Sequence, residues 1–128
     1  MRVQPIRRVL VATDFSEHSR RAMEHALSLA ERMGASIDVL HVWEPPPHLE
    51  PESLVMVPGD PGTPLESIGL AQAGRLLHAW AERYHASPVP LRVHLERGPV
   101  ADTLQRCAGI LYLSRGAVCI FDFQRHTL

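Results

Sequence analysis

The hydrophobic pattern of the chain begins with a short apolar run, Val9-Leu10-Val11, which gives way to a small polar turn from Thr13 to Ser16. β-Branched and aliphatic residues in such a run are typical of a strand that is covered on both faces, as in parallel sheets. Ser16 has the chemistry of a helix N-cap. Ligands of open α/β sheets bind where such strands end, so Asp14 is predicted to point into a crevice. The alternative is that Asp14 only caps a turn.

A helix and a second strand are predicted next. Apolar residues recur at helical spacing up to Met33, and Gly34 stands where a left-handed C-cap ends a helix. The amphipathic pattern predicts a helix that covers a sheet. The second strand is expected from Ile37 to Trp43 and contains His41. No Ser or Cys nucleophile motif accompanies His41, so we interpret it as a core or edge-of-pocket histidine.

A proline-rich surface loop is expected over residues 44–62, and a second helix after it. Apolar residues at 54–56 could fold back onto the carboxyl edge of the sheet, and the sequence leaves this open. Thr63-Pro64-Leu65-Glu66 has the form of a capping box, with Thr63 as the N-cap and Glu66 reaching back. The helix is predicted to run through Tyr84 and to be closed by Ser87-Pro88.

The third strand, Leu91 to Glu96, alternates apolar and polar residues, which is typical of a strand at the edge of a sheet. Gly98-Pro99 then opens a short helix that is expected to end at Gly109, with an apolar face made by Val100, Leu104, Cys107 and Ala108. A fourth strand is predicted at Ile110–Leu113. Alternating strands and helices predict an α/β fold, a doubly wound parallel sheet with helices on both faces.

Composition narrows the function classes. The 128 residues predict a single domain, 1–128, and the formal net charge of −1 gives no basic excess for binding nucleic acid. Lysine is absent, since all 13 basic residues are arginine, and this excludes Schiff-base and Walker-type lysines. Cys107 and Cys119 lack the spacing of a zinc or redox motif, so no metal site is expected. Without an apolar signal region or membrane-length run, a cytoplasmic location is expected, with no membrane partner.

The stretch Val11-Ala12-Thr13-Asp14-Phe15-Ser16, the helix that ends at Gly34 and the strand Val39-Leu40-His41-Val42 together resemble the amino-terminal half of the universal stress protein family. The resemblance implies a strand order of 3-2-1-4-5 and ATP as the ligand. In that family the Asp after the first strand contacts the ribose and adenine side of ATP, and the residue after the second strand's His lines the adenine pocket. These positions are Asp14 and Val42, and Ala12 and Thr13 lie beside Asp14.

The resemblance weakens after the third helix. The family continues with Gly, two residues, Gly, nine residues, Gly and Ser or Thr, which binds the triphosphate. Gly116 could be the first of these glycines, but the second would fall at Cys119 and the third beyond Leu128. Residues 110–128 are therefore interpreted as an atypical tail in which the last helix and strand are missing or replaced, with Ala117–Phe121 as a short replacement strand. An out-of-frame tail is the alternative.

Three classes of function remain. One is an adenine-nucleotide-binding universal stress protein that uses Asp14, the Val42 backbone and Gly116. The second, favoured by the missing glycines, is a stress-response module in which ATP binding is weakened or lost and which acts as a homodimer or with another stress-response protein. An enzyme is the third class and is not expected, because Asp14, His41 and Asp102 form no recognisable catalytic constellation.

Overall fold

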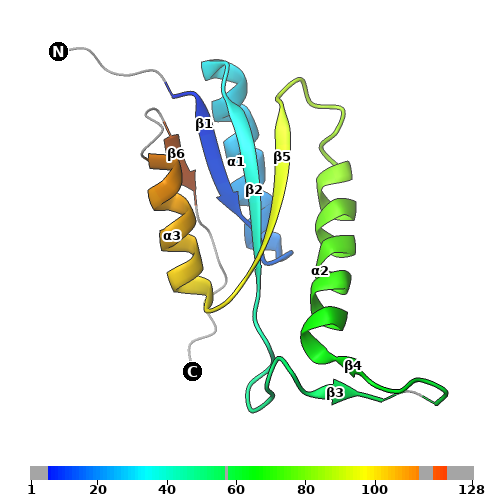
Figure 1. Cartoon of the computed structure of the whole chain (residues 1–128). Coiled ribbons are helices and arrows are strands. Elements are labelled where there is room, and N and C mark those ends of the chain that lie inside the picture. The colour runs from blue at the N-terminus through cyan, green and yellow to red at the C-terminus, as the bar shows by residue number, and fades with distance from the viewer. Residues whose placement is uncertain (1–5, 57, 113–116, 121–128) are drawn as a thin grey trace.

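The computed structural model describes residues 6–56, 58–112 and 117–120. Strands and helices alternate along most of this range (Figure 1). In chain order the elements are β1 Arg8–Ala12, α1 Glu17–Met33, β2 Ser36–Trp43, β3 Leu54–Val55, β4 Thr63–Pro64, α2 Leu65–Glu82, β5 Leu91–Arg97, α3 Val100–Tyr112 and β6 Ala117–Ile120.

The main sheet has four parallel strands in the order β5-β2-β1-β6. Helices α1 and α2 pack on one face of this sheet, and α3 packs on the other (Figure 1). The doubly wound parallel fold and the order 3-2-1-4 are confirmed. β5 lies at the end of the described sheet, as its alternating pattern predicted.

The strand β1 separates two hydrophobic clusters. Val9 and Val11 are 0% exposed and pack with α1 and α2, whereas Leu10 and Ala12, at 2% and 1%, pack on the opposite face with Leu104 of α3. Successive side chains of a strand point to opposite faces, so an unbroken apolar run suits a strand that is covered on both sides.

Helix α1 begins and ends where the sequence indicates. Ser16 is the N-cap, and its Oγ accepts a hydrogen bond of 3.3 Å from the N–H of Ser19. Gly34 is the C-cap with φ 65°, a left-handed conformation that glycine adopts without steric cost, and its N–H binds the carbonyl of Ala30.

The predicted capping box of α2 is wrong. The helix starts at Leu65 with Pro64 at the N-cap position, and no side chain caps it. Thr63 instead pairs with Val55 in the small antiparallel β3–β4 sheet. Glu66 does not reach back, because its carboxylate forms an ion pair with Arg97 at the end of β5. The helix also ends at Glu82, before Tyr84 and the Ser87-Pro88 pair.

The predicted helix end at Gly109 and the fourth strand at Ile110–Leu113 are also wrong. Helix α3 continues through Gly109 to Tyr112, and Leu113 lies outside the described residues. A glycine inside a helix costs only about 1 kcal/mol, so Gly109 need not end it. The strand beside β1 is β6, within the stretch that was predicted to replace the fifth strand.

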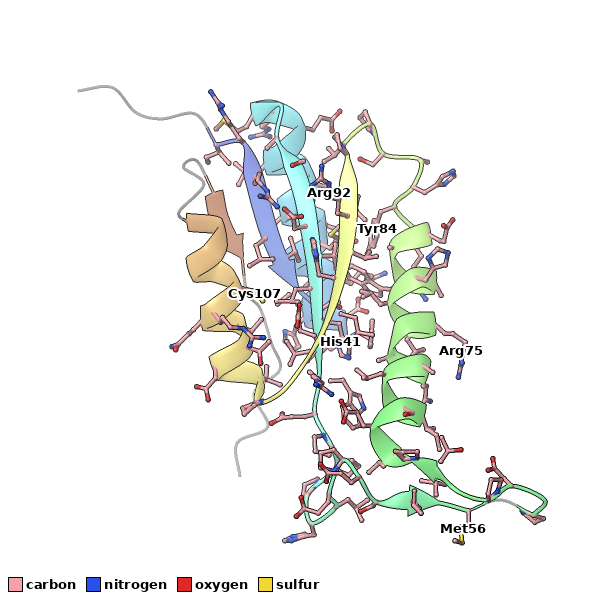
Figure 2. The ribbon with its side chains drawn as sticks, in the orientation of Figure 1. His41, Met56, Arg75, Tyr84, Arg92 and Cys107 are labelled. Carbon is pink, nitrogen blue, oxygen red and sulfur yellow. The ribbon has the colours of Figure 1, made fainter. Side chains whose placement is uncertain are left out.

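The loop between β2 and α2 carries the apolar side chains that the sequence left unassigned. Leu54, Val55 and Met56 are 57%, 37% and 73% exposed, so they do not fold back onto the main sheet. The loop projects away from the sheet, with Met56 near its tip (Figure 2). In the described part of the chain no helix combines the length and apolarity needed to cross a lipid bilayer.

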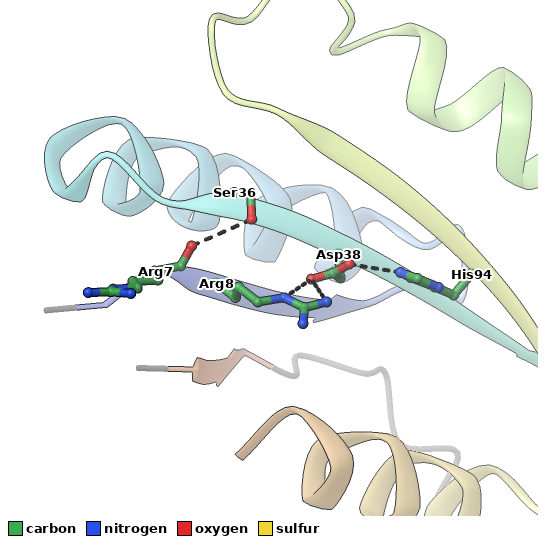
Figure 3. A network of polar contacts seen from close by, with 5 residues as sticks. All are labelled: Arg7, Arg8, Ser36, Asp38 and His94. Atoms are coloured by element: carbon green, nitrogen blue, oxygen red, sulfur yellow. Dashed lines mark hydrogen bonds and ion pairs between the residues drawn. The ribbon is translucent and has the colours of Figure 1, made fainter. Parts of the chain in front are cut away.

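A buried ionic network ties three neighbouring strands together on the α3 face (Figure 3). Asp38 of β2 has a side-chain exposure of 2%, and its Oδ2 accepts hydrogen bonds of 3.0 and 2.9 Å from the guanidinium of Arg8. The other carboxylate oxygen lies 2.8 Å from Nε2 of His94 on β5. The buried carboxylate is thus fully paired, as a charge removed from water must be.

Candidate functional site

A cavity of about 220 Å³ lies at the carboxyl ends of β1 and β2, beside the first half of α3. This is the edge of a doubly wound sheet at which ligands bind. Most of the wall is apolar, with a few polar groups, which is the usual make-up of a small-molecule site. The lining residues are Thr13, Asp14, Leu40, His41, Val42, Val100 and Leu104.

The turn between β1 and α1 fixes Asp14 at the mouth of this cavity. Its Oδ1 accepts hydrogen bonds from the N–H of Ser16 at 2.9 Å and from Oγ of the buried Ser19 at 2.6 Å. The Ser19 Oγ in turn accepts the Asp14 N–H at 3.0 Å. Asp14 does cap this turn, but only through one oxygen: no described residue donates to Oδ2. A ligand can use that second oxygen.

Asp14 is ionised at neutral pH. Burial acts to raise the pKa of this carboxyl, but the hydrogen bonds from Ser16 and Ser19 outweigh burial and hold the pKa below its usual value. A carboxylate accepts hydrogen bonds and donates none. The chemistry available at Asp14 is therefore recognition of hydroxyl or N–H donors.

His41 lies beside Asp14 with a fixed orientation. Its Nδ1 is 2.7 Å from the carbonyl oxygen of Thr13, and because a carbonyl only accepts, Nδ1 carries the proton and donates it. The ring of Phe15 packs against the imidazole with centroids 4.3 Å apart. Burial lowers the pKa of His41, although the Thr13 carbonyl and the Asp14 charge act in the opposite direction. The imidazole is thus neutral at pH 7, with Nε2 left as an acceptor.

The backbone of Val42 adds polar groups at the same edge. In a parallel ladder, alternate residues bond to alternate neighbours, and Leu40 bonds to β1 because its carbonyl accepts the N–H of Thr13 at 2.8 Å. Val42, two residues later, therefore also directs its N–H and C=O toward the β1 side. The paired register of β1 ends at Ala12 opposite Leu40, so these groups lie past the end of the ladder, beside the cavity.

The structure brings Thr13, Asp14 and Val42 together around the cavity. Ala12 was expected beside Asp14 in the site but lies in the core on the α3 face, 1% exposed, and does not line the cavity. Gly116 lies outside the described residues. Sequence reasoning missed the apolar wall of Leu40, Val100 and Leu104. Leu40 and Val42 are two residues apart in a strand, so their side chains lie on the same face. This signal could have placed Leu40 in the site.

Within residues 6–56, 58–112 and 117–120, no group of three or more His, Cys, Asp or Glu side chains is arranged to hold a metal ion. Asp102, Asp14 and His41 are likewise not joined by any described hydrogen bond. The site therefore offers hydrogen-bond acceptors, backbone groups and an apolar wall.

Comparisons with known proteins agree on one family. The model of the universal stress protein family matches residues 5–109. No curated protein matches the sequence significantly.

Several solved structures share the fold. A universal stress protein from Burkholderia pseudomallei is 21% identical, with a TM-score of 0.58 over 89% of this chain and 93% of that one. UspA from Lactobacillus plantarum is 19% identical, with a TM-score of 0.66 over 99% of this chain and 86% of that one. A universal stress protein in complex with cAMP is 14% identical, with a TM-score of 0.61 over 94% and 99% of the two chains.

Proposed function

Since the chain belongs to the universal stress protein family, we propose that its cavity binds the adenosine part of an adenine nucleotide. The observation that carries this proposal is the convergence of the Asp14 carboxylate and the Val42 backbone on one apolar cavity. An adenine base offers a flat apolar face together with N–H donors and ring acceptors, which suits an apolar wall next to free backbone groups. Ribose hydroxyls are the donors that a carboxylate recognises.

The size of the cavity supports a half-site rather than a complete nucleotide site. Its volume of about 220 Å³ is below the roughly 300–1,000 Å³ of pockets for drug-sized ligands. Cys119 lies inside β6, paired with Leu10, and none of residues 121–128 is a glycine. The family's glycine spacing is therefore not found after the strand that takes the fourth place in the sheet, and close approach of backbone to phosphate loses those glycines. We therefore propose that the phosphates add little to affinity. The relative with bound cAMP is consistent with recognition of an adenine nucleotide by this fold.

The biological role that fits this site is a stress-response binding module rather than an enzyme, acting in the cytoplasm. Its partner is a second copy of the chain or another stress-response protein. An interaction module without a nucleotide is the second candidate. The exposed Leu54, Val55 and Met56 on the projecting loop favour it, because exposed apolar groups often mark contact surfaces.

Calorimetric titration with adenosine, AMP and ATP tests the proposal. We expect the three ligands to bind with dissociation constants within roughly tenfold of one another, since adenosine supplies most of the contacts. Asp14→Asn keeps an oxygen for Ser16 and Ser19 but loses the charge, and should weaken binding by roughly tenfold or more.

Asp60→Asn is the matched control. Asp60 also accepts a backbone N–H two residues ahead, from Gly62 at 3.0 Å, but lies in the exposed loop. Binding that is unaffected by Asp14→Asn, or absent for all three ligands, contradicts the proposal and favours the interaction module. ATP binding far tighter than adenosine would contradict the half-site.

A further inference from the structure

The edge strand β5 has a long, regular and unpaired edge. Its seven residues pair with β2 without a bulge, from Leu91 opposite Ile37 to Arg97 opposite Trp43. No described strand pairs with its other side. At about 3.3 Å per residue this edge is roughly 23 Å long. Natural edge strands are usually protected by proline, bulges, short length or charged side chains, and within its span β5 has only the last of these, at Arg92, Glu96 and Arg97.

The hydrogen-bonding groups on this free edge can be assigned from the ladder. The carbonyl of Pro90 accepts the N–H of Ile37, and the N–H of Gly98 donates to Trp43, so even-numbered residues of this segment bond to β2. The N–H and C=O groups of the odd-numbered residues therefore point outward. They belong to Leu91, Val93, Leu95 and Arg97.

Charges along β5 complement each other under two-fold symmetry. Arg92 and Glu96 lie on the same face, two residues on either side of His94. Arg92 is exposed and has no ion-pair partner among the described residues; Figure 2 labels it on the ribbon of β5. Glu96 has only a loose pair with Arg106, at 3.7 Å. An antiparallel copy of β5 centred on His94 brings each Arg92 opposite a Glu96.

We propose that two copies of the chain associate through β5, in antiparallel register with His94 opposite His94 of the partner subunit. The odd-numbered residues then form the hydrogen-bonded pairs, and Val93 lies opposite Leu95 of the partner subunit. This contact covers Val93, which is 41% exposed in the single chain. The interface is isologous, as in most homodimers.

Neighbouring registers are less favourable. The outward N–H and C=O groups of the two strands can bond only if odd-numbered residues lie opposite odd-numbered residues. The two-fold axis can therefore move only from one residue to the next. Centring the axis on Val93 puts Arg92 opposite the partner's His94, and centring it on Leu95 puts Arg92 opposite the partner's Gly98. Both shifts lose the Arg92–Glu96 pairs. His94 is compatible with the axis because its ring is held back toward Asp38 (Figure 3).

The α2 face of the sheet beside β5 leaves room for side chains of a second strand. A cavity of about 330 Å³ runs between α2 and β5, with His78 and Glu82 on the helix side and Leu91 and Val93 on the strand side. This proposal specifies the homodimer named under the proposed function, and it does not require nucleotide binding.

Disulfide trapping tests the register. In a Cys107→Ser, Cys119→Ser background, His94→Cys should form a disulfide-linked dimer, because Cα atoms of a non-hydrogen-bonded pair are about 4.5 Å apart, within disulfide range. Arg92→Cys is the matched control and should not cross-link, since its two copies would be more than about 13 Å apart along the strands.

Charge reversal gives a second readout that does not alter His94. Sedimentation of the native chain should show a dimer, Arg92→Glu or Glu96→Arg should raise its dissociation constant roughly tenfold, and the double swap should restore it. A dimer in which His94→Cys does not cross-link overturns the proposal. A chain that stays monomeric at submillimolar concentration also overturns the proposal, and an extended peptide would then be the partner of the β5 edge. If that monomer still binds adenosine, the dimer proposal has failed but the proposed function has not.

Discussion

At the residue scale, the turn after β1 holds the site in shape through a few specific contacts. Phe15 has φ 64°, a left-handed conformation that is uncommon for a residue with a bulky side chain. That conformation places its ring on the imidazole of His41. The donation from His41 to the Thr13 carbonyl then joins the end of β2 to the end of β1. Aromatic packing and a buried hydrogen bond offset the strain at Phe15.

His41 should make stability depend on pH. Its folded pKa is depressed chiefly by burial, whereas the unfolded value is about 6.5. The unfolded chain therefore takes up the proton first as pH falls. The stability that neutral His41 provides is complete above about pH 6.5 and is lost as pH falls through the folded pKa.

Urea unfolding near pH 7.5 and pH 5.5 measures this effect (about one pH unit on either side of the unperturbed value). We expect the native chain to lose on the order of 1 kcal/mol more than His41→Gln between the two conditions. The variant serves as the control for the other histidines. Equal losses in the two proteins would show that His41 is not buried in its neutral form.

Asp14 illustrates how far a single residue could be predicted. Its place after an apolar strand and before an N-cap was enough to locate it at the carboxyl edge, and the turn chemistry was enough to expect a capping role. That the described residues leave Oδ2 without a donor could not be predicted, because it depends on both Ser16 and Ser19 binding the same oxygen. The position of His41 beside Asp14 could not be predicted from local sequence either, because it depends on the parallel pairing of β1 with β2.

At the element scale, the errors of prediction share one cause, which is that contacts distant in sequence outweigh local signals. Thr63 and Glu66 have the spacing of a capping box, but β3 pairs with Thr63 and Arg97 binds Glu66. The apolar run at 110–112 resembles a strand, but its backbone forms the last turn of α3. The sequence-local elements, β1, α1 and β2, were predictable because pattern and caps agree there.

Helix α2 contains two glycines that provide a matched pair of substitutions. A Cβ at Gly69 would overlap the indole ring of Trp43, whereas a Cβ at Gly74 would meet only Leu95 Cδ2 at 3.8 Å, an ordinary contact. Gly74→Ala should therefore stabilise the protein by about 0.5–1 kcal/mol, the usual gain inside a helix.

Gly69→Ala should instead destabilise the chain, by about 1–3 kcal/mol, since Trp43 must move out of its packed position. Chemical denaturation of the two variants beside the native protein measures both effects. Similar stabilisation by both substitutions would mean that Trp43 does not pack on α2 at Gly69.

At the scale of the whole molecule, the candidate site and the proposed dimer contact lie on different parts of the parallel sheet. The carboxyl ends of β1 and β2 form the candidate site with α3, while β5 presents its free edge at the far side of the sheet. Strand and helix alternation was enough to predict a doubly wound sheet, whereas the strand order was predictable only from the family resemblance. The apolar wall that α3 adds was not, because it depends on where the crossover from β5 places Val100 and Leu104.

A residue-resolved NMR titration of the labelled chain with adenosine tests the adenosine site most directly. We expect the largest amide shift changes at Val42 and in the turn around Asp14, and smaller ones along Val100 to Leu104. The amides of β5 from Leu91 to Leu95 should stay unchanged. Saturable shifts confined to another surface, or no shifts at millimolar adenosine in a folded protein, would contradict the assignment of the cavity as an adenosine site.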